Sequence, residues 1–302
     1  MTNSQPIDRG GLLAAIGAYV LWGVFPLYWF LLKHVPSLQI IAHRVIWCAV
    51  FVIAWLLWRD GAAGFKRALA TPKVLPLLIA SSLLISVNWG LYIWAVTHGR
   101  VVDSSLGYFI NPLVNVALGV LVFSERLNIR QWASVAIAAA GVVWLTVQHG
   151  ELPWIALCLA FSFACYGLIR KVANVESVQG LGIESGFLLI PALLVVGFGI
   201  GSGGYTALQL SAREWLLLVV GGGLTALPLI GFAYGARRIP YSLMGVLQYL
   251  SPTLQLLCGV LLLGESFSRS QAIGFGLIWL ALLIYAADGV WRSRQRVVEA
   301  ET

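Results

Sequence analysis

The chain has 302 residues, of which 60% are hydrophobic and only 10% carry a charge, and its formal net charge is +7. Soluble domains carry roughly 25% charged residues, and a globular protein of this size exposes many of its side chains to water. The composition therefore excludes an ordinary water-soluble protein and indicates a chain that lies in a membrane.

Long apolar blocks follow one another along the chain, and each is long enough to cross a bilayer as a helix. The hydrocarbon core requires about 20 apolar residues, and the uncharged stretches 12–32 and 241–263 are two examples. We predict ten transmembrane helices, at 11–33, 38–58, 74–97, 103–123, 129–147, 153–171, 179–200, 213–235, 241–263 and 270–290. The longest expected connection, 59–73, is too short for a soluble domain. The predicted fold class is therefore an all-α membrane protein.

The basic residues lie mainly on one side of this arrangement. With the N-terminus inside, the inner segments hold 14 of the 19 Lys and Arg residues and the outer loops hold 4, while Arg44 lies within a span. Short loops rich in Lys and Arg stay in the cytoplasm. We therefore expect both termini to be cytoplasmic, in the inner membrane of a bacterium.

An internal repeat relates the two halves of the chain at an offset of 140 residues. Its matches pair Pro112 with Pro252, Gly119-Val120-Leu121 with Gly259-Val260-Leu261, Glu125 with Glu265, and Gln131 with Gln271. Each half, 1–150 and 151–302, holds five predicted helices. Because five is odd, the second copy crosses the membrane in the opposite sense, as an inverted repeat. Many secondary transporters use this architecture for alternating access, with a substrate site near the midplane.

Two ionisable residues lie inside predicted spans, where a charge is costly unless it pairs, reaches the interface or lines water. Arg44 in the second span either reaches the outer headgroups, pairs with Asp103, or binds an anionic group in a wet cavity. Glu184 in the seventh span either pairs with a basic residue at the cytoplasmic rim or couples transport to protons. The basic residues considered as its partner are Arg170, Lys171 and Arg237.

Uncharged polar side chains gather in the third, fourth and ninth spans. The fourth-span group shares one helix face by its i, i+3, i+7 spacing and consists of Tyr108, Asn111 and Asn115. The ninth span repeats this spacing in Gln248, Ser251 and Gln255. Such groups either line a polar cavity or hydrogen-bond neighbouring helices. The prolines at 112 and 252 either break helices near the site or are tolerated kinks.

We predict one substrate site from these polar groups and two tryptophans. Its candidate residues are Trp22, Arg44, Asn88, Trp89, Tyr108, Asn111, Gln248 and Tyr249. Glu184 is the candidate for proton coupling, and Pro112 and Pro252 are the candidate helix breaks. The cysteines lie inside apolar blocks and the histidines in separate segments, so we expect no disulfide, metal or cofactor.

Several stretches resemble one known family. They include His43-Arg44-Val45-Ile46-Trp47, Asn88-Trp89, Ser105-Leu106-Gly107-Tyr108-Phe109-Ile110-Asn111-Pro112-Leu113, Gly167-Leu168-Ile169-Arg170-Lys171, Gln248-Tyr249 and Gly264-Glu265. The chain is similar to the EamA branch of the drug/metabolite transporter superfamily. The resemblance implies ten helices and export of small organic solutes, such as amino acids, related metabolites or drugs such as chloramphenicol. Four-helix multidrug members exchange protons through a carboxylate in their first helix, but 11–33 contains no acidic residue.

Taken together, the sequence predicts a secondary transporter, and more specifically an exporter. A flippase or a channel-like facilitator is the alternative. A membrane enzyme requires clustered acids or histidines, and an ATP-driven pump requires a GxxxxGK[ST] loop; the sequence has neither. The expected partners are a small-molecule substrate and membrane lipid, with no nucleic acid.

Overall fold

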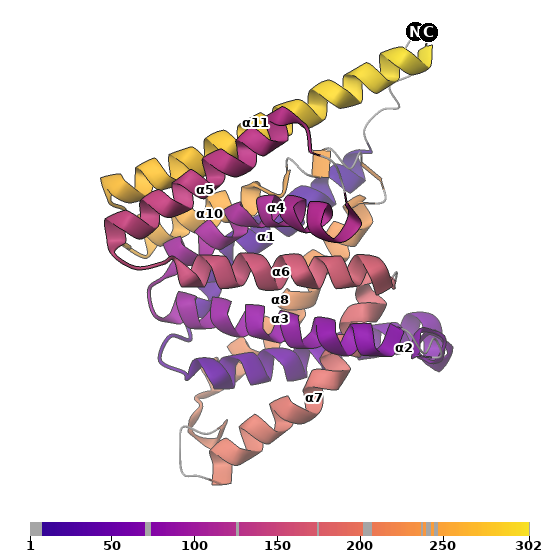
Figure 1. The fold of residues 1–302 in the computed structure, drawn as a ribbon. Coiled ribbons are helices and arrows are strands. Elements are labelled where there is room, and N and C mark those ends of the chain that lie inside the picture. The colour runs from indigo at the N-terminus through magenta and orange to yellow at the C-terminus, as the bar shows by residue number, and fades with distance from the viewer. Residues whose placement is uncertain are drawn as a thin grey trace.

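The computed structural model describes residues 8–69, 74–124, 127–173, 175–201, 207–236, 238–239, 243–244 and 247–301. Throughout these ranges the regular structure is helical, with no strand (Figure 1). Nine of the helices described there are long and apolar enough to cross a membrane. The prediction of an all-α membrane protein is therefore confirmed.

The helix bounds follow the predicted spans closely for most of the chain. In order, the helices are α1 (Arg9–Phe30), α2 (Ser37–Leu69), α3 (Val74–Thr97), α4 (Val101–Phe123), α5 (Ile129–His149), α6 (Trp154–Ala173), α7 (Ser177–Gly201), α8 (Ala212–Ala236), α10 (Leu250–Leu257) and α11 (Arg269–Glu301). Two short helices, η1 (Ala207–Gln209) and η2 (Cys258–Leu262), complete the set.

The segment after the second span differs from the prediction, because most of it is helical rather than a loop. α2 continues as far as Leu69, past a single non-helical residue, Gly61, with φ of 62°. A left-handed φ is open to glycine at little cost because it has no Cβ. Gly61 therefore lets the chain change direction where the apolar span ends and the basic segment begins.

The predicted ninth span, 241–263, is not one continuous helix among its described residues. Gln248 and Tyr249 form a turn, α10 begins at Leu250, and the chain then passes into the π-helix η2. Pro252 is the third residue of α10, where a missing backbone N–H leaves no intrahelical bond unmade. The helix break predicted for this region therefore lies just before Pro252.

Pro112 behaves differently from its counterpart in the predicted repeat. α4 continues on both sides of it, from Val101 to Phe123. A proline inside a helix removes one hydrogen bond to the carbonyl four residues earlier, which here is that of Tyr108. The expected break is therefore not found at Pro112, where the helix continues with one bond fewer.

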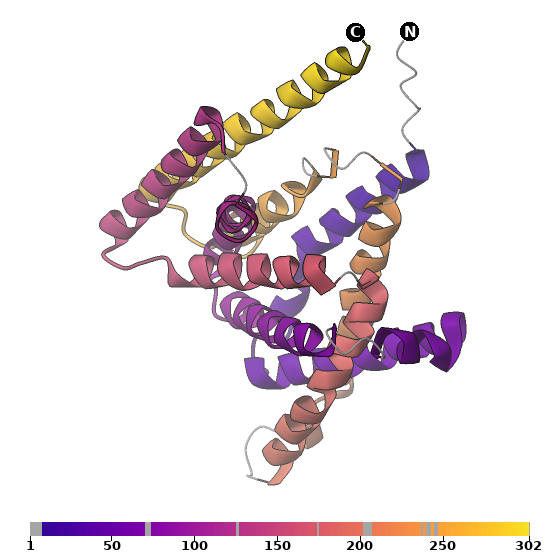
Figure 2. The same cartoon turned by 45° about the vertical axis from the view of Figure 1, so that its right-hand side comes forward.

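The helices pack in a small number of extensive pairs. α2 packs against α7, and α5 against α11. α6 packs against both α3 and α4, whereas α1 packs against both α8 and α10. α8 also contacts α2, and α7 also contacts α3. Figures 1 and 2 show α5 and α11 side by side at one edge of the molecule, away from the α2–α7 pair.

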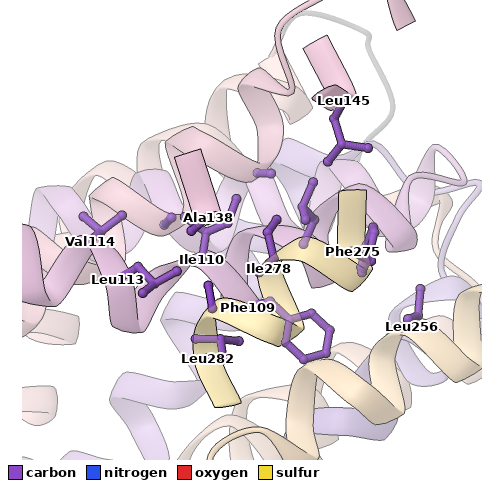
Figure 3. Packing of buried hydrophobic residues seen from close by; sticks show 14 of the residues in the cluster. Phe109, Ile110, Leu113, Val114, Ala138, Leu145, Leu256, Phe275, Ile278 and Leu282 are labelled. Carbon is purple, nitrogen blue, oxygen red and sulfur yellow. The ribbon is translucent and has the colours of Figure 1, made fainter. Parts of the chain in front are cut away.

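Aromatic and aliphatic side chains fill the interior between α4, α5, α6, α10 and α11 (Figure 3). The Phe109 ring of α4 meets the Phe275 ring of α11 edge to face at 6.0 Å and the Trp279 ring at 5.8 Å. Large apolar side chains also face outward, such as Leu121 and Phe198, each 78% exposed. An outward apolar surface suits lipid, because lipid tails are as apolar as these side chains.

Glycines allow several close approaches between helices. A Cβ on Gly222 of α8 would lie 2.3 Å from Cβ of Trp47 and 2.7 Å from the backbone nitrogen of Cys48, both on α2. A Cβ on Gly107 of α4 would lie 2.7 Å from the carbonyl oxygen of Ala156 on α6. These contacts involve backbone atoms, so the neighbouring helix would have to move as a whole.

The Gly222 contact predicts a loss of stability when a methyl group is added there. Gly222→Ala should lower the free energy of unfolding by about 1–3 kcal/mol, as overpacking typically does. Thermal unfolding of the purified protein in detergent, followed by the loss of the monodisperse chromatographic peak, measures this effect. Gly17→Ala is the matched control, because a Cβ on Gly17 meets nothing within 4 Å. Equal melting of both variants would contradict the assignment.

Candidate functional site

Arg44 lies on α2 with 4% of its surface exposed and its guanidinium held between two helices. Its Nε donates to Oγ1 of Thr225 on α8 at 3.0 Å, and the Thr225 hydroxyl donates to the carbonyl of Gly221 at 2.9 Å. The central guanidinium carbon lies 4.2 Å from the Trp89 ring centre and 5.2 Å from that of Trp29. Arg44 and Trp89, both predicted site residues, are thus in contact, by a cation–π interaction.

The structure does not support two of the alternatives considered for Arg44. Asp103 does not pair with it, since its carboxylate lies 3.6 Å from the guanidinium of Arg100. Arg44 also does not extend to the surface, because its side chain is buried. What remains of the prediction is a desolvated guanidinium surrounded by aromatic rings.

Several polar atoms near Arg44 are buried without a hydrogen-bond partner in the described part of the chain. They are Nη1 of Arg44, Nε1 of Trp29 and the hydroxyl of Tyr92. The Tyr92 ring meets the Tyr108 ring at 5.9 Å, and both tyrosines lie within electrostatic range of the Arg44 guanidinium. Buried polar groups are normally bonded, so this cluster requires an explanation.

The predicted polar stripe of the third and fourth spans mainly holds helices together. Nδ2 of Asn88 donates to the carbonyl of Leu159 and to Oγ of Ser162, each at 3.0 Å. Nδ2 of Asn111 donates to the carbonyl of Ala160 at 3.4 Å. Both amides therefore bind α6 backbone, which is the interhelical alternative. Tyr108 joins the stripe to the Arg44 cluster, since its hydroxyl donates to Oδ1 of Asn88 at 3.4 Å.

The other predicted residues are Trp22, Gln248 and Tyr249. Tyr249 packs against the hydrophobic cluster between α4, α5, α6, α10 and α11, and Gln248 precedes it in the turn before α10. The Trp22 ring meets Phe232 at 6.0 Å and Tyr19 at 5.6 Å. The structure thus brings Arg44, Trp89 and Tyr108 together with Asn88. Trp22 also packs against the buried cluster that contains Trp29 and Tyr92, whereas Gln248 and Tyr249 lie just before α10.

A proline inside α1 exposes a carbonyl that a glutamine satisfies from another helix. Pro26 has no N–H to donate to the carbonyl four residues earlier, that of Trp22. Nε2 of Gln255 on α10 donates to this carbonyl at 3.1 Å and to Oγ of Ser251 at 3.3 Å. The neighbouring Gly23 carbonyl accepts from Sγ of Cys258 at 3.8 Å. α10 is thereby attached to the weakened point of α1.

Glu184 of α7 is 1% exposed and lies among groups from α3 and α6. Its carboxylate accepts from Oγ of Ser81 at 2.5 Å and from the Tyr166 hydroxyl at 3.2 Å, and Nη1 of Arg170 lies 3.6 Å away. The predicted pairing with Arg170 is thus present, while Arg237 lies outside the described residues. A Cβ on Gly180 would lie 1.5 Å from Nη1 of Arg170, so only glycine leaves room for this guanidinium.

Glu265 joins the two halves of the chain at the start of α4. Its carboxylate accepts from the backbone N–H groups of Val101 and Val102, at 2.7 and 2.8 Å. These amides have no partner within their own helix, and the helix dipole favours a negative charge at this end. Burial raises the pKa of the Glu265 carboxyl above its ordinary value, and the two hydrogen bonds only partly offset that shift.

Sequence reasoning missed Trp29, Tyr92 and Thr225 as neighbours of Arg44. Two signals were present: Tyr92 lies one helical turn after Asn88, and Trp29 lies seven residues after Trp22, so each shares a helix face with a predicted site residue. Thr225 gave no such signal. Its role depends on the packing of α8 against α2, which only the structure shows.

The fold and this interior describe a multi-pass membrane protein with a polar, aromatic centre, and comparison with known proteins defines its family. The model of the EamA-like transporter family matches residues 9–147 and again 153–287. The chain is 44% identical to the "Uncharacterized transporter PA0485" of Pseudomonas aeruginosa, covering 96% of this chain and 97% of that one. It is 42% identical to "Protein RarD" of Streptomyces exfoliatus, over 95% and 91% of the two chains. The chain therefore belongs to the EamA-like transporter family and is a RarD-like membrane transporter.

A solved structure supports the fold independently. It is described as "Crystal structure of protein" and superimposes with a TM-score of 0.58, covering 91% of this chain and 96% of its own. The sequences are 22% identical, so this likeness concerns the fold alone.

The Gln255 bond to the Trp22 carbonyl predicts a rescue between two substitutions. Gln255→Leu leaves that carbonyl without its partner and should lower the free energy of unfolding by about 1–3 kcal/mol. Pro26→Ala restores a backbone N–H within α1, so the double variant should recover most of the loss. Thermal unfolding of the four proteins of this double-mutant cycle measures the coupling. Additive effects would contradict the account.

Proposed function

We propose that the chain is a secondary transporter, acting as an exporter of small organic solutes by alternating access between two inverted five-helix repeats, 1–150 and 151–302. The observation that carries this proposal is the symmetry of helix pairing. If α1 to α5 correspond to α6, α7, α8, α10 and α11, then α2–α7 and α5–α11 are self-related pairs. Three further sets of extensive pairs exchange with one another: α3–α6 with α1–α8, α4–α6 with α1–α10, and α2–α8 with α3–α7.

The family matches support the same division of the chain. The first match ends at 147 and the second begins at 153, on either side of the proposed boundary at 150. In this proposal, five helices in each unit reverse the sense of the second unit. The excess of Lys and Arg in the inner segments supports a cytoplasmic position for both termini. The start of α1 and the end of α11 lie toward the same end of the molecule in Figure 2, in line with an even number of crossings.

The proposed substrate site lies where Arg44 of the first repeat meets Thr225 of the second. We retain Trp89 and Tyr108 from the predicted residues and add Trp29 and Tyr92, because these surround the guanidinium. Asn88 and Asn111 position α6 through its backbone carbonyls. Sites between repeats are remodelled when the repeats move, as alternating access requires.

Hydrogen bonds and ion pairs tie the helices together at both ends of this site. On the proposed outer side, Glu265 of the second repeat binds the start of α4 in the first. On the proposed inner side, Arg59 of α2 binds Glu176, which immediately precedes α7, at 3.0 Å, and Arg170 of α6 pairs with Glu184 of α7. Opening either side would require these contacts to separate.

Solute release from proteoliposomes tests the proposed function. Vesicles preloaded with aromatic, aliphatic or sulfur-containing amino acids, or with chloramphenicol, should release at least one class faster than protein-free vesicles.

Glu184→Gln should retain release down a solute gradient but lose acceleration by a pH gradient, because the side chain no longer takes up a proton. Glu151→Gln, at an exposed glutamate of a loop, is the control. Release equal to that of empty vesicles for every solute would contradict transport, and intact pH coupling in Glu184→Gln would contradict the proton role.

The Glu265 contact predicts which change opens the outer side. Leu106 lies on α4 one turn beyond the bonded amides and is buried. In a cysteine-free background, Leu106→Cys should react with a membrane-impermeant maleimide added outside several-fold faster when Glu265→Ala is also present. Glu151→Ala, at an exposed glutamate of another outer loop, is the control. Unchanged labelling, or labelling only from the cytoplasmic side, would contradict the proposed closure or its sidedness.

A further inference from the structure

The charge of Arg44 is not balanced by any acid in the described part of the chain. The ion pairs found there join other residues: Asp103 lies beside Arg100, and the carboxylate of Glu184 lies beside Arg170. The guanidinium instead contacts the aromatic rings of Trp29 and Trp89 and the Thr225 hydroxyl. A buried, unpaired charge in a membrane helix is costly and marks a functional position.

The hydrogen bonds of Arg44 leave one terminal nitrogen of the guanidinium without a partner among the described residues. Nε is bound to Thr225, and that hydroxyl donates to the Gly221 carbonyl. The guanidinium is therefore held at its Nε side, while Nη1 is buried without a partner. The terminal nitrogens of arginine form a planar fork that matches the two oxygens of a carboxylate.

The other unpartnered polar atoms of this cluster have matching chemistry. The Trp29 indole nitrogen can only donate, and the Tyr92 hydroxyl can donate to an acceptor. An ionised carboxylate is a pure acceptor with about four lone-pair positions. A carboxylate therefore has enough acceptor positions for the unpartnered donors from α1, α2 and α3. An organic cation would meet a positive charge there, and a neutral amide would bring donors of its own.

We infer that Arg44, Tyr92 and Trp29 form a binding site for the carboxylate group of the transported solute. This inference rests on the proposed function and adds the substrate class, organic carboxylates. The edge-to-face series of Tyr92, Tyr108 and Phe163, at 5.9 and 6.1 Å, supplies apolar ring surface beside the site for the body of such a solute. Tyr108 also connects this surface to Asn88.

Binding of a matched acid and amide to the purified protein tests this inference without requiring transport. The probes are phenylacetate and phenylacetamide, which differ only in the carboxylate. Quenching of tryptophan fluorescence is a suitable signal, because Trp29 and Trp89 flank Arg44. Phenylacetate should bind at least tenfold more tightly than phenylacetamide. Arg44→Gln should abolish this preference, and Arg44→Lys should weaken it, because the charge remains but the planar fork is lost. Arg213→Gln, at an exposed arginine of α8, should leave it unchanged.

Tyr92→Phe provides the sharper variant, because it removes an unpartnered hydroxyl without changing the ring. The ligand-free protein should melt at the same temperature or higher, since no hydrogen bond is lost. The affinity for phenylacetate should fall about tenfold, the loss of one charge-assisted hydrogen bond. Tyr234→Phe, at an exposed tyrosine, is the control. A structural role alone for Tyr92 would instead lower the melting temperature and spare binding.

The outcomes separate this inference from the proposed function. Absence of phenylacetate binding, equal binding of acid and amide, or binding unaffected by Arg44→Gln and Tyr92→Phe would overturn the carboxylate site. Release of a neutral solute from proteoliposomes, with no preference for acids, would overturn the site while leaving the transporter intact. Tight carboxylate binding without release of any solute would support the site and overturn the transport proposal.

Discussion

A lipid bilayer offers no hydrogen-bond partners, and most of this structure follows from that constraint. Each backbone N–H and carbonyl at membrane depth must be satisfied within the protein, so the described chain is helical wherever it is regular. Exceptions need a side chain from elsewhere. The Gln255 side chain donates to the carbonyl that Pro26 leaves without a partner in α1, and the Glu265 carboxylate accepts from the amides at the start of α4. These hydrogen bonds come from side chains on another helix or loop, so they also determine which helices are joined.

Close packing is the second consequence, because helices in lipid gain little from the hydrophobic effect. Their association depends on van der Waals contact and interhelical hydrogen bonds. Gly222 and Gly107 bring backbones together, and Asn88 and Asn111 then bind carbonyls of α6. α6 is thereby held by both α3 and α4, and the polar stripe identified in the sequence serves this attachment.

The sequence predicted the spans well because each is a long apolar run, and the third was predicted with the bounds that the structure has. It failed at the ninth span, since an apolar run does not reveal where the helix is interrupted, and after the second span, where residues 59–69 continue α2 apart from Gly61. Arg44 and Trp89 were found because an ionised residue and a tryptophan inside a span are conspicuous. Thr225 was not, because its importance arises from a contact between helices far apart in the chain. Glu184 was assigned a partner among alternatives that only the fold could separate.

The bond between Arg44 and Thr225 has a consequence for the energetics of the whole molecule. The two residues belong to different halves, so a movement of one half against the other changes the direction in which the guanidinium points. The affinity for an anion then differs between conformations, and by thermodynamic linkage the anion shifts the population toward the conformation that binds it better. The Thr225 hydroxyl would in this way couple the binding of an anion at Arg44 to the relative position of the two halves.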